Sequence, residues 1–128
     1  MKKLLLALVV ALSFPFVSNA QVAAEIWNYS NCEWRVEVDY VDAPYSCNVT
    51  ETQEAFLPAG MSSYLLLPSK LSTSVDATVF RVFDIFGTLV ATVSVQCGSP
   101  FQVTIPGCGP GQGPHLIQCD NRFLAIYP

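Results

Sequence analysis

The sequence predicts an all-β fold, an antiparallel β-sandwich of about eight short strands with immunoglobulin-like or jelly-roll connections. Three observations lead to this prediction. Apolar and polar residues alternate with a period of two in several segments, as they do in strands with one buried face. Glycine and proline lie at the ends of those segments, and no long segment free of both has a helical period. With 52% hydrophobic and 12% charged residues, the chain is also too apolar to be disordered.

The most regular strand pattern covers residues 33–40, where apolar and charged residues alternate strictly. The side that we expect to face the core consists of Trp34, Val36, Val38 and Tyr40. Arg35, Glu37 and Asp39 share the opposite side, which we expect to face solvent. Such a strand is half buried, as in an antiparallel sheet that packs on one side only.

Residues 79–85 and 88–95 are expected to form a hairpin, because Phe86 and Gly87 between them fit a tight turn. The first segment is apolar on both faces, which is typical of a central strand. The second alternates, and its expected inward residues are Leu89, Ala91, Val93 and Val95. Weaker strand patterns lie at residues 22–27, 47–56, 62–67, 101–105 and 122–127.

The first twenty residues have the order of a secretory signal peptide. Lys2 and Lys3 precede an apolar run over residues 4–17, and residues 18–20 place small side chains before a cut after Ala20. This run is shorter than the roughly 20 apolar residues of a membrane anchor, and no other spanning segment follows it. We therefore expect a bacterial protein that is secreted or periplasmic, in which residues 21–128 form a single domain.

The charge of the expected mature domain limits its partners. Loss of the signal peptide removes two lysines and leaves four basic residues against ten acidic ones, a net charge of −6. Four scattered cations cannot form the basic surface that neutralises a phosphate backbone. A nucleic-acid partner is therefore not expected.

The cysteines also indicate an oxidising compartment. All five lie in the expected mature domain: Cys32, Cys47, Cys97, Cys108 and Cys119. Fifteen arrangements of two disulfides and one thiol are open, and closeness in the chain favours Cys32–Cys47 with one pair among the last three. The odd thiol is expected to be buried and inert, with a dimer cross-linked through it as an alternative.

Metal and catalytic motifs are largely missing from the sequence. Cys97, Cys108, Cys119 and His115 lack the close Cys-x2–4-Cys spacing of structural zinc sites, so neither metal nor other cofactor is expected. His115, the only histidine, follows a glycine- and proline-rich segment and is expected to be a solvated loop residue. No catalytic residue is assigned. A secreted hydrolase using Glu37 and Asp39, about 7 Å apart along one strand, is the enzymatic alternative.

Binding is the function class that the sequence favours. The aromatic residues that could stack on a sugar are Trp27, Tyr29, Trp34, Tyr40, Tyr45, Tyr64 and Tyr127, of which Trp34 and Tyr40 are expected in the core. Residues 106–114 are nearly all glycine and proline and predict a long surface loop, whose glycines would let a ligand approach the backbone. The predicted binding residues are Trp27, Tyr45, Gly109, Gly111 and Gly113.

The expected function is therefore a non-enzymatic binding or surface module for a glycan or protein ligand. A structural or assembly protein cross-linked through an unpaired cysteine is a further alternative. Residues 26–36, Ile26-Trp27-Asn28-Tyr29-Ser30-Asn31-Cys32-Glu33-Trp34-Arg35-Val36, resemble the opening of thaumatin-like proteins, in which Asn-x-Cys precedes a strand; here Asn31 stands directly before Cys32. Those proteins are longer and far richer in cysteine, so the resemblance is limited to one way of starting a sandwich and assigns no family.

Overall fold

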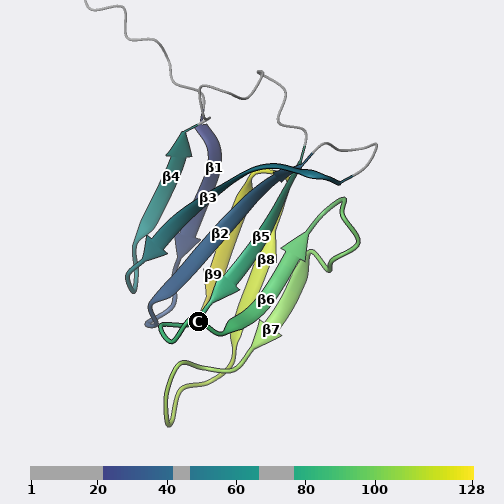
Figure 1. The fold of residues 1–128 in the computed structure, drawn as a ribbon. Helices are drawn as coiled ribbons and strands as arrows, with labels where there is room; N and C mark the ends of the chain where they lie inside the picture. Colours follow the sequence, from purple (N-terminus) through teal and green to yellow (C-terminus); the bar gives the residue numbers. More distant parts are fainter. Residues whose placement is uncertain (1–21, 42–46, 67–76) are drawn as a thin grey trace, which may run out of the picture.

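The computed structural model describes residues 22–41, 47–66 and 77–128, which form two stacked β-sheets (Figure 1). The strands are β1 (Val22–Asn28), β2 (Trp34–Val41), β3 (Val49–Leu57), β4 (Ser62–Leu66), β5 (Ala77–Phe83), β6 (Leu89–Ser94), β7 (Gln102–Ile105), β8 (His115–Cys119) and β9 (Phe123–Tyr127). One sheet has the order β4-β1-β9-β8-β7 and the other β3-β2-β5-β6. The predicted β-sandwich is confirmed, whereas the expected signal peptide lies outside the described residues.

Most neighbouring strands run antiparallel, as hairpins or a meander. The exception is the pair of β1 and β9, the first and last strands, which run parallel in the middle of the five-stranded sheet. Both strands therefore end at the same edge of the sandwich, next to the β5–β6 turn and the β7–β8 loop (Figure 1). This edge is called the loop end below. Within the described residues, no helix is long and apolar enough to cross a membrane.

The core lies between the sheets and follows the period-two pattern. The four apolar residues of β2 expected to face inward are all buried: Trp34, Val36, Val38 and Tyr40. They pack in one cluster with apolar side chains of both sheets, among them Ile26, Phe80, Val82, Leu124 and Ile126. Burial of this apolar surface is the main force that holds the two sheets together.

Strand β8 was not expected, because it is short and directly follows the glycine- and proline-rich segment. It nevertheless has the strand period, since His115, Ile117 and Cys119 are buried whereas Leu116 and Gln118 are not. The loop of residues 106–114 therefore joins β7 to β8.

Two inward positions predicted for residues 88–95 are also wrong. Leu89 and Val95 are both about half exposed. A register shift opposite Val82 and Phe83 pairs Leu89 with the outward-facing Phe83, so the alternation changes face there. Val95 lies beyond the end of β6, which is Ser94.

Candidate functional site

The disulfides join parts of the chain that are far apart in sequence. Cys32 pairs with Cys108 and Cys47 with Cys97, across 76 and 50 residues, with Cα–Cα distances of 5.8 and 5.7 Å. The expected pairing of Cys32 with Cys47 is wrong, because these residues lie at opposite ends of the β2–β3 hairpin. The expected pair among the last three cysteines is also wrong, since two of them bond to earlier cysteines and Cys119 is free. Two disulfides, as found here, are typical of proteins in an oxidising compartment.

Cys119 is the free cysteine, and it is buried on β8. Burial raises the pKa of its thiol to about 11, and the neighbouring Asp120 carboxylate adds to the shift. A thiol that stays protonated is a poor nucleophile. The inert buried thiol fits this position, whereas a cross-link to a second chain would need an accessible sulfur.

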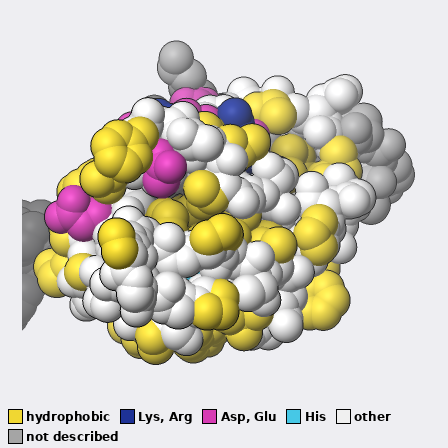
Figure 2. Space-filling view, turned by 90° about the horizontal axis from the view of Figure 1, so that it is seen from below, with side chains coloured by type: hydrophobic (Ala, Val, Ile, Leu, Met, Phe, Trp, Pro, Cys, Tyr) yellow, Lys and Arg dark blue, Asp and Glu magenta, His cyan; other side chains and the backbone are white. Residues whose placement is uncertain are grey.

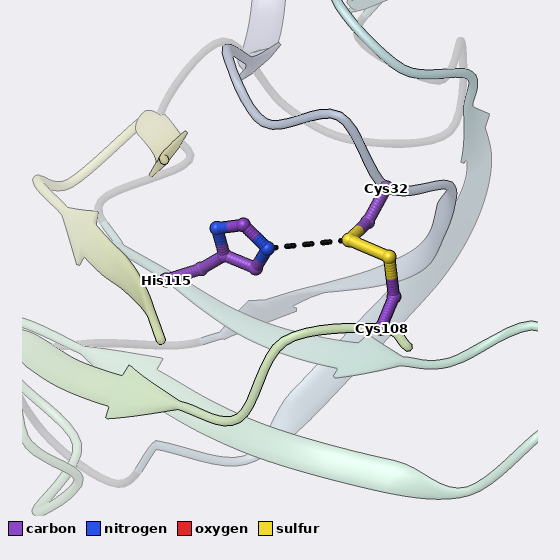
Figure 3. Close-up of side chains that lie close together, drawn as sticks. All are labelled: Cys32, Cys108 and His115. Atoms are coloured by element: carbon purple, nitrogen blue, oxygen red, sulfur yellow. Dashed lines mark hydrogen bonds between the residues drawn. A yellow bond between two sulfur atoms is a disulfide. The ribbon is translucent and has the colours of Figure 1, made fainter. Parts of the chain in front are cut away.

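His115 is a core residue of β8, and its expectation as a solvated loop residue is wrong. Its side chain is 3% exposed, and its ring meets Trp34 edge to face at 6.1 Å between centroids. Its Nε2 lies 3.2 Å from the Sγ of Cys32, and its buried Nδ1 has no hydrogen-bond partner among the described residues. The histidine thus contacts the Cys32–Cys108 disulfide (Figure 3).

Asn28 fixes the turn that carries Cys32. Its buried side-chain amide donates to the carbonyl oxygens of Cys32 and Pro58 at 2.7 and 3.0 Å. Its Oδ1 accepts from the hydroxyl of Ser30 at 2.6 Å, and that hydroxyl in turn accepts from the indole of Trp34. These bonds satisfy buried polar groups and fix the turn between β1 and β2.

A groove of about 460 Å³ lies at the loop end, beside the Cys32–Cys108 disulfide. Its apolar lining comes mainly from Trp34, Ile85, Phe86 and Val90, and its acidic lining from Glu33 and Asp84. Figure 2 shows this end of the molecule, with hydrophobic side chains spread over it and acidic ones toward one side. The Asp84 carboxylate accepts from the backbone N–H groups of Phe86 and Thr88, which fixes the β5–β6 turn.

Of the glycines in the loop of residues 106–114, only Gly107 is among the residues that line the groove. A Cβ on Gly107 would meet the Gln112 side chain at 2.5 Å, so the loop folds back closely at this residue. Gly111 adopts a positive φ of 77°, which favours glycine. The predicted binding glycines are exposed but do not line the groove: Gly109, Gly111 and Gly113.

The second surface of interest is a row of aromatic rings on the outer face of the five-stranded sheet. Tyr64 of β4 meets Trp27 of β1 edge to face at 6.1 Å. Trp27 stacks on Tyr29 at 5.8 Å, and Tyr29 stacks on Tyr127 at 5.4 Å. Tyr29 and Tyr64 are each about half exposed, and Trp27 and Tyr127 are partly buried. This set of four residues is called the aromatic row.

A carboxylate accompanies the aromatic row. Glu25 lies two residues before Trp27 on the same face of β1 and pairs with Tyr64 of β4. One of its carboxylate oxygens accepts the indole N–H of Trp27 at 2.8 Å. The row therefore combines ring surface with hydrogen-bonding groups: the carboxylate and three tyrosine hydroxyls.

Trp27 is the one predicted aromatic anchor that the structure describes, since Tyr45 lies outside the described residues. Trp27 does not line the groove, so it belongs to a different surface from the loop. Tyr29, Tyr64 and Tyr127 are among the residues that could stack on a sugar, but they are not predicted binding residues. The i, i+2 spacing of Glu25, Trp27 and Tyr29 indicates a shared face, but the order of β4, β1 and β9 is needed to add the others.

Glu37 and Asp39, the alternative catalytic pair, are both engaged by arginine. Arg81 binds Asp39 through two nitrogens, each at 2.9 Å from a carboxylate oxygen, and reaches Glu37 at 2.9 Å. Asp39 also accepts the hydroxyl of Thr52 at 2.7 Å, and Glu37 contacts Arg35 at 3.3 Å. Both carboxylates are thus held in ion pairs, with side chains that are 19% exposed in Glu37 and 8% exposed in Asp39.

Comparison of the chain with protein-family models, curated proteins and solved structures finds no match in any of the three. The function is therefore inferred from the geometry of the chain's own residues.

Proposed function

We propose that this protein is a non-enzymatic binding module that holds a neutral glycan on its aromatic row. The observation that carries the proposal is the contact of four rings from three neighbouring strands, Tyr64, Trp27, Tyr29 and Tyr127, on one outer face. Exposed aromatic clusters of this kind are unusual on a monomer and mark interaction surfaces. Two of the rings are about half exposed, so a ligand can reach them.

The chemistry of the row fits a sugar. The C–H groups on one side of a pyranose ring are weakly positive and pack on the negative face of an aromatic ring. The Glu25 carboxylate accepts hydroxyl hydrogens, and tyrosine hydroxyls donate or accept. A sheet face also holds these groups rigidly, which reduces the entropy that binding costs.

Charge narrows the ligand class. Ten acidic residues against six basic ones in the whole chain disfavour polyanions, including nucleic acids, whose bases would otherwise stack on such rings. Glu25 within the row adds local negative charge. These observations favour a neutral oligosaccharide over a sulfated or sialylated one.

Export is part of the proposal. A glycan-binding module of this kind would meet its ligand outside the cytoplasm, after removal of the first twenty residues by a signal peptidase. The two disulfides support an oxidising location.

The test is a glycan array followed by calorimetric titration of the strongest neutral oligosaccharide. Trp27→Ala and Tyr64→Ala should each weaken binding about fivefold or more, since an aromatic contact contributes on the order of 1 kcal/mol beyond buried area. Phe56→Ala is the matched control, because Phe56 is 59% exposed, similar to Tyr64 at 51%, but belongs to β3 of the other sheet.

Melting temperatures of all three variants show whether each one folds. Equal affinity of wild type and the folded Trp27→Ala variant, or the same loss in Phe56→Ala, would overturn the proposal. An array on which only sulfated or sialylated glycans bind would contradict the choice of a neutral ligand.

A further inference from the structure

We propose that the Cys32–Cys108 disulfide is a thiol–disulfide exchange site whose reaction partner is a dithiol of a peptide or protein. In this site Cys108 is the sulfur that is attacked, Cys32 is the leaving group, and His115 stabilises the thiolate that leaves. This activity is separate from glycan binding, because none of these residues belongs to the aromatic row.

The two sulfurs of this disulfide have different environments. Cys32 is 2% exposed, whereas Cys108 is an exposed residue of the β7–β8 loop. We therefore place the attack of an incoming thiolate at the exposed Cys108 and not at the buried Cys32. Exchange depends on which sulfur is accessible and on how well the other one leaves.

His115 lies where it can assist the leaving sulfur. Its Nε2 is 3.2 Å from the Sγ of Cys32, and the ring points toward the disulfide from β8 (Figure 3). A thiolate formed at the buried Cys32 would be costly without a hydrogen-bond donor or positive charge beside it. An N–H on Nε2 supplies that donor at the sulfur that needs it.

The buried Nδ1 of His115 is an independent observation. It has no hydrogen-bond partner among the described residues, although a buried polar atom normally has one. Packing alone would be served by an apolar side chain at this position. The cost of an unpaired buried nitrogen is not explained by packing, which supports a role for the ring at the disulfide.

The reaction balances in two steps. A thiolate of the dithiol attacks Cys108 Sγ, a sulfur–sulfur bond forms between them, the Cys32–Cys108 bond breaks, and its electron pair leaves on Cys32. The second thiol of the partner then attacks the partner's first sulfur, which is bonded to Cys108 in the mixed disulfide, and releases Cys108 as a thiolate. The partner loses two electrons and two protons and becomes a disulfide, and the two cysteines gain them.

The adjacent groove gives a peptide partner a place to bind. Cys32 and Cys108 are part of its lining, together with the apolar Trp34, Ile85 and Phe86. Phe86 and Ile85 are largely exposed on the β5–β6 turn, so apolar surface is available next to the reactive sulfur. A peptide with apolar residues near its cysteines would bury that surface.

The Cys47–Cys97 disulfide is an internal control. His115 is the only histidine of the chain, and it lies beside Cys32, so no second imidazole can assist Cys47 or Cys97. Under the same reductant, the Cys32–Cys108 bond should open about tenfold faster or more.

The experiment exposes the folded protein to dithiothreitol below the concentration that unfolds it. Samples are quenched with acid over time, alkylated, and mapped by mass spectrometry to give the opening rate of each disulfide. Glutathione, a monothiol, then traps the mixed disulfide, which is expected on Cys108.

His115→Leu should slow the opening of Cys32–Cys108 about tenfold, and His115→Gln, which keeps a donor, should slow it less. Simple destabilisation has the opposite sign, because a loosened fold exposes both disulfides and speeds both reactions. The proposal is overturned if Cys47–Cys97 opens as fast in the wild type, if glutathione is found on Cys32, or if His115→Leu does not slow the reaction.

Discussion

The two outer faces of the sandwich present different kinds of side chain to solvent. On the four-stranded sheet, Arg35 and Arg81 form ion pairs with Glu37, Asp39 and Glu54, and the guanidinium of Arg35 lies 4.2 Å from the centre of the Phe83 ring. On the five-stranded sheet, the aromatic row leaves ring surface and tyrosine hydroxyls exposed.

This difference indicates which outer face can bind a ligand without breaking interactions within the protein. The five charged residues named above pair with one another, so a ligand that binds to them would have to break existing ion pairs. The rings of the aromatic row contact each other through part of their surface only. A binding function is therefore better supported on the five-stranded sheet, although both faces follow the same strand period.

The largest stability effect is expected from the charged face. Asp39→Asn removes the charge that Arg81 binds through two nitrogens and should lower the free energy of unfolding by about 2 kcal/mol. Glu54→Gln is the control, because its pair with Arg35 is exposed and should contribute less than about 1 kcal/mol. Urea unfolding gives the free energy of unfolding of both variants. Equal decreases would show that the ion pair of Asp39 with Arg81 contributes no more than the exposed pair of Glu54 with Arg35.

A pH effect is expected from β2 of the same sheet. Burial, with a smaller contribution from Glu51, raises the pKa of Tyr40 to about 12, and its hydroxyl donates to Gln53 at 2.6 Å. The folded pKa exceeds the ordinary tyrosine pKa of 10.0, so this contribution to stability is complete below pH 10 and is lost as pH rises toward 12.

Tyr40→Phe should therefore lose less stability than the wild type between pH 10 and pH 12, as measured by urea unfolding at each pH. The thiol of Cys119 is a second group with a raised pKa, about 11, and it reduces stability at lower pH than Tyr40 does. Measuring Cys119→Ala in the same way shows how much of the alkaline loss comes from this thiol. If Tyr40→Phe loses as much stability as the wild type between pH 10 and pH 12, Tyr40 does not cause the alkaline loss.

The sequence predicted the sandwich because its core depends on local alternation, most clearly in β2. It missed β8, since five residues after a glycine- and proline-rich loop are too few to establish a period without neighbouring strands. The disulfide pairing was wrong for a related reason. Distance along the chain does not determine which strand ends meet when the chain passes between two sheets.

The candidate site was predictable in part. The sequence predicts Trp27 as a binding residue, but Tyr64 joins it through the pairing of β1 with β4, and Tyr127 joins the row through the parallel pairing of β1 with β9. The burial of His115 was hidden for the same reason, because a histidine after prolines has the sequence context of a loop. Both features need the strand order, which the sequence pattern does not contain.

The most direct test of the central claim is to map the bound glycan by NMR. Amide shifts of the ¹⁵N-labelled protein are followed during titration with the neutral oligosaccharide that binds best on the array. Binding at the aromatic row predicts shifts concentrated in β4, β1 and β9, around Glu25, Trp27 and Tyr64. Shifts concentrated in β2, β3 and β5, around Arg35 and Arg81, or in the loop of residues 106–114, would contradict it.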